Sequence, residues 1–417
     1  MKLARRNASG NPTSPPTPPL AKVSGLTIAI VGAGIGGLTA ALSFARQGHS
    51  VTLIERRTGF SEVGAGLQLS PNASRILIKL GLSPALRRVA TMPDRVVVRG
   101  ISSGKRIGEV ALGAYMQQRY GAPYWVIHRA DLQTILLDAV RSEPSIRIII
   151  GRKVEEVRDG PDHAELIWTS SNGSRESMTA DVVIGADGVW SKVRQAVGDK
   201  ALPTFHGYVA WRSTCDRKII PPELADNETG LWLGAKGHVV HYPIFSGHLV
   251  NVVAIVKTNE PVEGWAAPGR TEDLLAYYSS ASPALRELLK KPQEWLRWSL
   301  FRHPIKRLSR GRIALLGDAA HPVLPFLAQG AALAIEDAAT LSALLARNPQ
   351  DVVQALAAYQ EHRFERVTRI QAEGRRNGRI YHSGSLVAFG RDKIMQMIGP
   401  ESMSNRYDWI YGFRTPE

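Results

Sequence analysis

Apolar runs separated by glycines predict alternating strands and helices in the first part of the chain. Residues 26–31 (LTIAIV) are almost all apolar, as expected of a parallel strand buried on both faces. Residues 38–46 read as a helix that stops before Gly48, and residues 51–54 form a second apolar strand that ends at Glu55. This order predicts a βαβ unit.

Later segments predict more of this sheet and a second sheet of a different kind. Three apolar runs, at 146–150, 180–185 and 313–316, predict strands that return to the first sheet. Residues 205–257 are rich in aromatic and β-branched residues with glycines at turn-like intervals, which predicts an antiparallel sheet. Strands of a meander are expected over 95–112. Helices are expected over 70–80, 126–140, 271–290, 331–345 and most of the chain beyond 352.

The fold class is therefore α/β, with a Rossmann-like dinucleotide-binding domain, an inserted antiparallel sheet and C-terminal helices. Residues 1–24 are rich in Pro, Ser and Thr and contain four Lys or Arg and no acid, so we expect a disordered tail and no secretory signal. The expected division is a dinucleotide-binding domain over 25–200 and 300–350, a substrate-binding sheet over 201–299 and a helical segment over 351–417.

A glycine-rich turn follows the first strand. Gly32, Gly34 and Gly37 form a GxGxxG pattern, with Gly36 as an additional glycine inside it. In a βαβ unit such glycines let the backbone approach a pyrophosphate at the helix N-terminus, and an acid in the place of Glu55 binds the adenosine ribose. The pattern alone is weak, because chance matches occur in glycine-rich chains and a βαβ unit can bind nothing.

A rarer motif lies almost 300 residues later, at 317–322 (GDAAHP), followed by 329–332 (QGAA). Together with the glycine-rich turn and the segment 180–188 (ADVVIGADG), it makes the chain from 25 to 413 resemble the single-component FAD-dependent aromatic hydroxylases. That family includes salicylate, 3-hydroxybenzoate and 6-hydroxynicotinate monooxygenases, and a weaker match lies at 406–412. The resemblance implies a PHBH-like fold, FAD as cofactor and NADH or NADPH as co-substrate.

The resemblance also implies which residues bind FAD. Arg129 would reach the phosphate and ribityl region, Val154 would lie near the adenine, and Asp318 would bind the ribityl chain. Gly330 and Ala331 would begin a helix aimed at the N1–C2=O edge of the flavin, where free N–H groups stabilise the negative charge of the reduced ring. The alternative interpretations are that Asp318 caps the N-terminus of a helix and that Arg129 forms a surface ion pair. The complete expected set is Gly32, Gly34, Gly36, Gly37, Glu55, Arg56, Gln68, Arg129, Val154, Asp318, Gly330 and Ala331.

Two residues of the segment 237–243 (GHVVHYP) match the family's catalytic pair. On a strand, His238 and Tyr242 point to one face and His241 to the other. In the family, NAD(P)H reduces FAD, O2 adds at C4a, and the C4a-hydroperoxyflavin transfers OH to a ring that is more reactive as its phenolate, so a base near the phenol is useful. Without the resemblance, His238 is a polar loop residue and Tyr242 a core aromatic.

The substrate pocket departs from both named relatives. Gln68 and Phe326 stand where the 6-hydroxynicotinate enzymes have His, and Pro325 stands where 3-hydroxybenzoate hydroxylases tend to have Gln. Phe326 and Arg212 are expected to contact substrate, Arg212 through a carboxylate, although an ordinary strand arginine is an equal interpretation. The resemblance therefore assigns neither substrate.

Charge and cysteine content bear on which partners, disulfides and metal sites the chain can have. The net charge is +15, with a cluster at Arg363, Arg366, Arg369, Arg375, Arg376 and Arg379. The cluster is interpreted as a solvated helix face or as a surface that steers an anionic substrate or cofactor. No zinc-finger or RNA-binding pattern accompanies the charge, and the single Cys215 excludes an intramolecular disulfide and a CxxC metal site. We expect a cytoplasmic monomer or homodimer without nucleic-acid partner, metal or membrane span.

The resulting hypothesis is an FAD-dependent, NAD(P)H-consuming monooxygenase that hydroxylates a small (hydroxy)aromatic or N-heteroaromatic acid in aromatic compound catabolism. The alternatives are a flavin reductase or oxidase of the same fold and a flavin-bound interaction protein without catalysis.

Overall fold

The computed structural model describes residues 25–60, 66–170 and 173–416. The tail predicted over 1–24 lies outside the described residues, as do residues 61–65. None of the described helices combines the length and the apolar character that a membrane-spanning helix requires.

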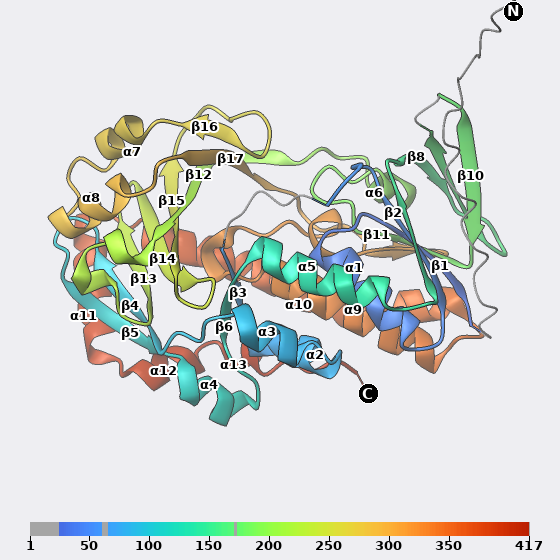
Figure 1. The fold of residues 1–417 in the computed structure, drawn as a ribbon, viewed down its shortest axis with the longest axis horizontal. Coiled ribbons are helices and arrows are strands. Elements are labelled where there is room, and N and C mark those ends of the chain that lie inside the picture. Colours follow the sequence, from blue (N-terminus) through green and yellow to red (C-terminus); the bar gives the residue numbers. More distant parts are fainter. Residues whose placement is uncertain (1–24, 61–65, 171–172, 417) are drawn as a thin grey trace, which may run out of the picture.

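A six-stranded sheet, parallel except at one edge, forms the dinucleotide-binding half of the molecule (Figure 1). Its central strand pairs in parallel with the second strand of the βαβ unit on one side and with a strand from the ADVVIGADG segment on the other, as the apolar pattern predicts. The order across the sheet is β18 (Ser309–Arg310), β19 (Ile313–Leu315), β11 (Val182–Gly185), β1 (Thr27–Val31), β2 (Ser50–Glu55) and β7 (Ile146–Ile150).

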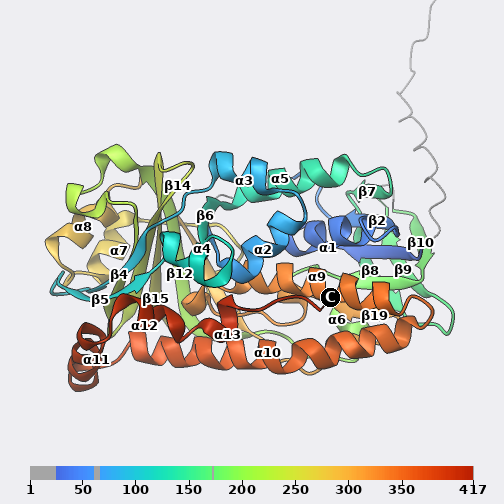
Figure 2. The same cartoon turned by 90° about the horizontal axis from the view of Figure 1, so that it is seen from below.

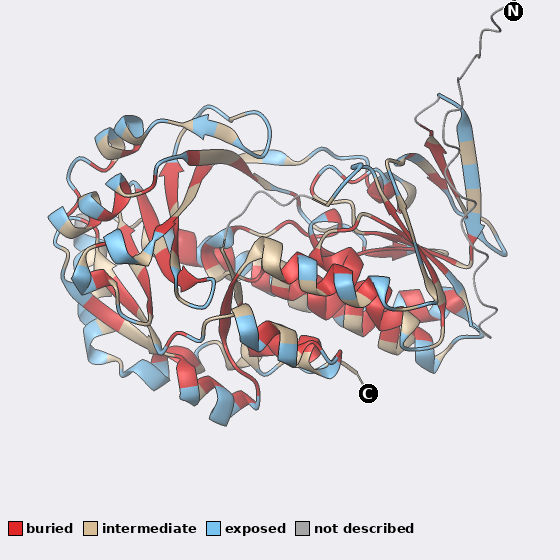
Figure 3. Ribbon diagram, in the orientation of Figure 1, coloured by how far each residue is buried: buried red, intermediate tan, exposed pale blue. Residues whose placement is uncertain are grey.

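Three helices, α1 (Ile35–Ala45), α5 (Arg129–Arg141) and α9 (Gly330–Arg347), pack together beside this sheet, and Figure 3 shows how deeply α1 and α9 are buried. Contact between α1 and α9 is close because Gly36 has no side chain: a Cβ there would lie 2.7 Å from the Leu316 side chain and 3.1 Å from that of Ala334. The glycine turn is thus locked to the segment that carries the second motif.

An eight-stranded sheet forms the other half. Its order is β16 (Ala267–Gly269), β17 (Trp295–Arg302), β12 (Thr204–Asp216), β15 (Leu249–Lys257), β14 (Gly237–Ile244), β13 (Glu228–Gly234), β4 (Arg95–Gly100) and β5 (Arg106–Ala111). Strands β12 to β15 fulfil the expectation of an antiparallel sheet. The sequence-based division placed 95–112 in the dinucleotide-binding domain, whereas β4 pairs in parallel with β13 and brings β5 into this sheet.

Smaller elements complete the two halves. Residues 126–128, expected to open a helix, instead belong to a strand, and the expected helix over 271–290 is two helices, with Pro283 in the first turn of the second. The strands are β3 (Gly66–Leu69) with β6 (Trp125–His128), and β8 (Lys153–Arg158), β9 (Ala164–Thr169) and β10 (Arg175–Ala180). The helices are α2 (Pro71–Lys79), α3 (Ser83–Val89), α4 (Gly113–Tyr120), α6 (Val193–Ala196), α7 (Thr271–Tyr277) and α8 (Pro283–Lys290).

The C-terminal segment is helical, as expected. Helix α10 (Val352–Tyr381) runs along both halves of the molecule (Figure 2). It is followed by α11 (Ser385–Met397), α12 (Pro400–Asn405) and α13 (Asp408–Tyr411). One helix therefore spans the distance between the two sheets.

Two adjacent carboxylates in α9 attach α10 to the core. Glu336 and Asp337 have no exposed surface. Arg363 is equally buried, and its Nη1 and Nε lie 2.7 Å from oxygens of Glu336 and Asp337, respectively. Arg366 donates Nε and Nη2 to Glu336 at 2.8 and 2.7 Å. The interpretation of the arginine cluster as a solvated face is therefore wrong for Arg363 and Arg366, which neutralise buried acids.

We predict that Arg363→Leu lowers the free energy of unfolding by about 3–5 kcal/mol, because it leaves buried negative charge without its partner. The matched control is Arg376→Leu in the same helix. Arg376 is 58% exposed and lies 3.4 Å from Glu373, so its loss should cost less than about 1 kcal/mol. Urea unfolding of both variants measures the difference, and equal losses would contradict the structural role of Arg363.

Candidate active site

A cavity of about 620 Å³ lies where the two halves of the molecule meet. The ends of β1 and β2 and the start of α9 contribute to it from one half, and β12, β14, β15 and β17 contribute from the other. The expected cofactor residues that line it are Gly32, Gly34, Gly36, Glu55, Arg56, Gln68, Arg129, Val154, Asp318, Gly330 and Ala331. Gly37 is the exception.

The glycine turn leaves room for a ligand against bare backbone. Gly32 has φ +103°, in the region that favours glycine, and a Cβ there would lie 2.4 Å from the carbonyl oxygen of Ala186. A Cβ on Gly34 would meet no atom within 4 Å, so this residue opens into the cavity. Gly37 serves packing instead, since a Cβ there would collide with the carbonyl oxygen of Gly32.

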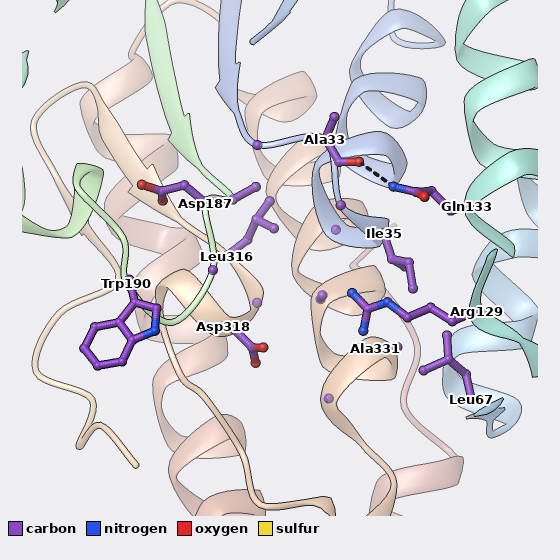
Figure 4. Close-up of a pocket in the computed structure, with 18 of the residues that line it drawn as sticks. Ala33, Ile35, Leu67, Arg129, Gln133, Asp187, Trp190, Leu316, Asp318 and Ala331 are labelled. Carbon is purple, nitrogen blue, oxygen red and sulfur yellow. Dashed lines mark hydrogen bonds between the residues drawn. The ribbon is translucent and has the colours of Figure 1, made fainter. Parts of the chain in front are cut away.

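Glu55 is fixed at the end of β2 by two backbone donors. The N–H of Ala33 donates to Oε2 and the N–H of Arg57 donates to Oε1, each at 2.9 Å. Across the turn, Gln133 donates Nε2 to the carbonyl oxygen of Ala33 at 3.3 Å (Figure 4). The carboxylate is therefore held at the mouth of the glycine turn, where the ribose of a dinucleotide is bound in βαβ units.

The second motif forms the opposite side of the cavity. Figure 4 shows Asp318 and Arg129 pointing into the cavity from different elements. Burial raises the pKa of Asp318, while His321, Arg129 and Arg194 oppose the shift. Arg194, which is buried, fixes this loop by donating Nε to the carbonyl oxygen of Ala319 at 2.7 Å and Nη2 to that of Asp318 at 3.0 Å.

Helix α9 presents its N-terminal end to the same space, since Gly330 and Ala331 line the cavity. The preceding residue, Gln329, is buried and donates Nε2 to Ser70 Oγ at 2.9 Å, and its Oε1 accepts from Asn72 at 3.0 Å. The positive end of a long buried helix is thereby held against the cavity, where it stabilises an anion.

His238 and Tyr242 reach the cavity from one face of β14, as their parity predicts. His241 points to the other face, where Trp232 donates Nε1 to its Nδ1 at 3.1 Å. Burial lowers the pKa of His238 well below its ordinary value and raises the pKa of Tyr242, so both side chains are neutral near pH 7.

Behind His238, two further side chains form a hydrogen-bonded chain. His238 Nδ1 lies 2.9 Å from Nε2 of His382, and His382 Nδ1 lies 3.1 Å from the hydroxyl of Tyr208. His382 directly follows α10 and is 144 residues from His238, so no local pattern in the sequence could have indicated it. Burial, together with the positive charges of Lys257 and Arg391, lowers the pKa of His382 to about 4.

The two residues expected to contact substrate have different positions. Arg212 lines the cavity, with its guanidinium 4.6 Å from the ring centre of Trp298. Phe326 is buried behind the cavity wall, its ring 5.2 Å from that of His238, and the structure does not bring it to the cavity. Sequence reasoning also missed Gln133 and Arg194, whose polar side chains act on backbone far away in the sequence.

These residues fit FAD. Gly34 leaves bare backbone for a pyrophosphate, Glu55 stands ready for a ribose, and the N-terminal end of α9 faces the place where a reduced flavin would carry its negative charge. Several cations line the same cavity and suit the phosphates, among them Arg56, Arg129 and Lys192.

Comparisons with known proteins agree with this geometry. Residues 26–373 match the family described as FAD binding domain. A 3-hydroxybenzoate 6-hydroxylase from Polaromonas naphthalenivorans is 35% identical over 390 residues, covering 93% of this chain and 96% of the relative. A 6-hydroxynicotinate 3-monooxygenase from Bordetella bronchiseptica is 33% identical over 351 residues, covering 82% and 89%. The crystal structure of Klebsiella pneumoniae HpxO complexed with FAD and uric acid has a TM-score of 0.79 at 25% identity, covering 91% of this chain and 95% of that one.

We predict that Glu55→Ala weakens FAD retention by about 1–3 kcal/mol, because it removes a charged acceptor from the expected ribose position. Titration of FAD-free protein with FAD, followed by flavin fluorescence, measures the loss. The control is Glu165→Ala, which removes an exposed partner of Arg158 on β9 and should leave FAD affinity unchanged. Equal affinities in wild type and Glu55→Ala would exclude a role for Glu55 in binding.

Proposed function

This chain belongs to the FAD-dependent aromatic monooxygenases, and on that basis we propose that it hydroxylates a small aromatic acid that already carries a ring hydroxyl. NADH or NADPH and O2 are the proposed co-substrates. The observation that carries the proposal is the shared cavity: His238 and Tyr242 line the same space as the glycine turn and the start of α9. A polar pair suited to a phenol thus lies beside a flavin site.

The substrate class follows from the relatives and from one arginine. The names of the two relatives describe acids with a ring hydroxyl, hydroxybenzoate and hydroxynicotinate. In this chain, Arg212 is the proposed partner of the substrate carboxylate. Its Nη2 donates to the carbonyl oxygen of Trp265 at 3.2 Å and its guanidinium stacks on Trp298, which together orient its planar group.

When bound, FAD would be reduced by the nicotinamide co-substrate and would activate O2. The protein positions the reactants and stabilises their charges. Gly34, Glu55, Arg129 and Asp318 would hold the cofactor. The N-terminal end of α9 would stabilise the negative charge of its reduced form, because the helix dipole is positive at that end.

His238 is the proposed base. With Nδ1 directed to His382, Nε2 is the nitrogen that remains for the proton of a substrate phenol. A base whose pKa is lowered by burial cannot keep a phenol's proton, so deprotonation requires that the proton moves on. We propose that, as Nε2 of His238 takes the proton of the phenol, Nδ1 of His238 gives its own proton to Nε2 of His382. His382 in turn releases the proton of its Nδ1 toward the hydroxyl of Tyr208 and solvent.

Tyr242 has a different proposed role. Because burial raises the pKa of its hydroxyl, Tyr242 stays protonated and donates a hydrogen bond to the substrate oxygen. Such a donor stabilises the phenolate that His238 produces. The proposed roles therefore differ: His238 accepts a proton and Tyr242 donates a hydrogen bond.

The experiment that tests the function is a screen of hydroxylated aromatic acids for stimulated NADH and NADPH oxidation, with products identified by mass spectrometry. A monooxygenase forms one hydroxylated product for each NAD(P)H consumed. Release of peroxide without product for every acid would favour a flavin oxidase of the same fold, and absence of turnover would favour a binding protein.

We predict that His238→Ala lowers hydroxylation by about 10²–10⁴-fold at neutral pH and leaves FAD bound, because a general base is lost. The deficit should shrink at high pH, where solvent deprotonates the phenol. His248→Ala, at the exposed turn between β14 and β15, is the control. Wild-type product formation by His238→Ala at neutral pH would place the base elsewhere.

We predict that His382→Gln slows hydroxylation with little change in the KM for the acid, because glutamine fills the position without relaying a proton. His248→Gln, at the exposed turn between β14 and β15, is the control, since His248 lies outside the hydrogen-bonded chain. Added imidazole should restore activity to a His382→Ala variant, whose small side chain leaves room for the ring, and a purely structural role of His382 would not show this rescue. In wild type, His382 is neutral above its pKa of about 4, so the relay should fail only below about pH 4.

A further inference from the structure

A second cavity, of about 610 Å³, opens on the other side of the wall formed by His382 and Phe326. Phe326 forms ring contacts with both His238 and His382, so this outer cavity is separated from the proposed substrate site by a single layer of side chains. Neither the family comparison nor the proposed reaction assigns it a role.

Positive charge collects at the outer cavity. Lys257 at the end of β15 and two arginines one turn apart in α10, Arg375 and Arg379, are exposed and line it. Among the described residues, none of these three forms an ion pair, and no carboxylate lines the cavity. The neighbouring Arg376, in contrast, pairs with Glu373. Burial is the main reason that the pKa values of His206 and His382 are lowered. The positive charges of Arg375, near His206, and of Lys257, near His382, lower them further.

Flat rings form the inner wall. The ring centres of His206 and Tyr208 are 5.6 Å apart with planes at 33°, and those of Tyr208 and His382 are 5.1 Å apart with planes at 32°. Phe326 meets Tyr208 edge-on at 6.0 Å. Neighbouring aromatic rings, tilted by 32–33° to one another, lie beneath a cationic rim and suit a ligand that is planar at one end and anionic at the other.

We propose that the outer cavity binds a planar aromatic ring carrying an oxyanion, and that it is the first docking position of an anionic reactant, either the acid or the dinucleotide. The substrate and one co-substrate of the proposed function have this chemistry: an aromatic acid carries a carboxylate, and a nicotinamide dinucleotide carries phosphates. The biological ligand rests on the proposed function, whereas the binding of ring-bearing anions rests only on the cavity.

Ala235 allows occupancy to be measured at the cavity itself. It is exposed and lines the rim, so Ala235→Cys provides a position for a small bimane fluorophore. The native Cys215 is buried, and burial raises the pKa of its thiol to about 11, so labelling is selective. The labelled, FAD-loaded protein is titrated with 3-hydroxybenzoate and with NAD+, which causes no turnover.

We expect a saturable signal with at least one probe and a Kd raised about tenfold by Arg375→Gln or Arg379→Gln, the size of a lost charged hydrogen bond. Arg376→Gln, with the same loss of charge one residue away, should change the Kd less than about twofold. An effect confined to 3-hydroxybenzoate assigns the cavity to the aromatic acid, and one confined to NAD+ assigns it to the dinucleotide.

An unsaturable signal with both probes, or equal effects of Arg375→Gln and Arg376→Gln, would overturn the inference. The measurement needs no turnover. Failure of every acid to be hydroxylated, with this binding intact, would therefore contradict the proposed function and not the cavity.

Discussion

The buried charge cluster of Glu336, Asp337, Arg363 and Arg366 holds the two motifs of the flavin site in one arrangement. Two adjacent carboxylates in a fully buried part of a helix would be strongly unfavourable alone, because each loses its hydration. Two guanidinium groups balance them, and Asp337 also accepts the N–H of Gly317 at 2.9 Å and faces Nε2 of His321 at 2.6 Å. Although burial opposes it, these partners lower the pKa of Asp337 to about 2. The loop that carries Asp318 is therefore fixed by charges that cannot be removed singly.

Hydrogen bonds and one helix connect the same cluster to two sides of the cavity of the candidate active site. Glu336 accepts Nδ2 of Asn72 at 2.6 Å, and Asn72 in turn binds Gln329, so the start of α9 is positioned by the acids one to two turns further along it. On the other side, the arginines belong to α10, whose 30 residues span about 45 Å. That helix ends beside His382, so one rigid element links the cofactor loop to the hydrogen-bonded chain behind His238.

What could be predicted from the sequence depended on whether the signal was local. The βαβ unit, the returning strands and the parity of His238 and Tyr242 follow from apolar runs and from the two-residue period of a strand, and the structure agrees with them. The family and its fold were also identified correctly. The β4–β5 hairpin was placed in the wrong half, because a short alternating pattern does not specify which sheet edge it joins. Arg363 was expected on a solvated face and Phe326 at the substrate, but both are buried elsewhere. Neither position could be predicted, because burial of a single charged or aromatic residue depends on contacts with segments far away in the sequence.

The distribution of charge around His238 separates two tasks that would interfere with each other. Binding an anionic acid and an anionic dinucleotide calls for cations, which line the flavin cavity and the rim of the outer cavity. The proposed removal of a proton from the substrate calls for uncharged groups, since a permanent cation beside the proposed base would oppose a second positive charge. His238, His382 and Tyr208 form such a neutral wall, with Phe326 packed against it, between the two cationic spaces. The placement of the positive charge therefore matters more than its total of +15, because Arg363 and Arg366 are neutralised by buried acids and Arg375 and Arg379 lie outside this wall.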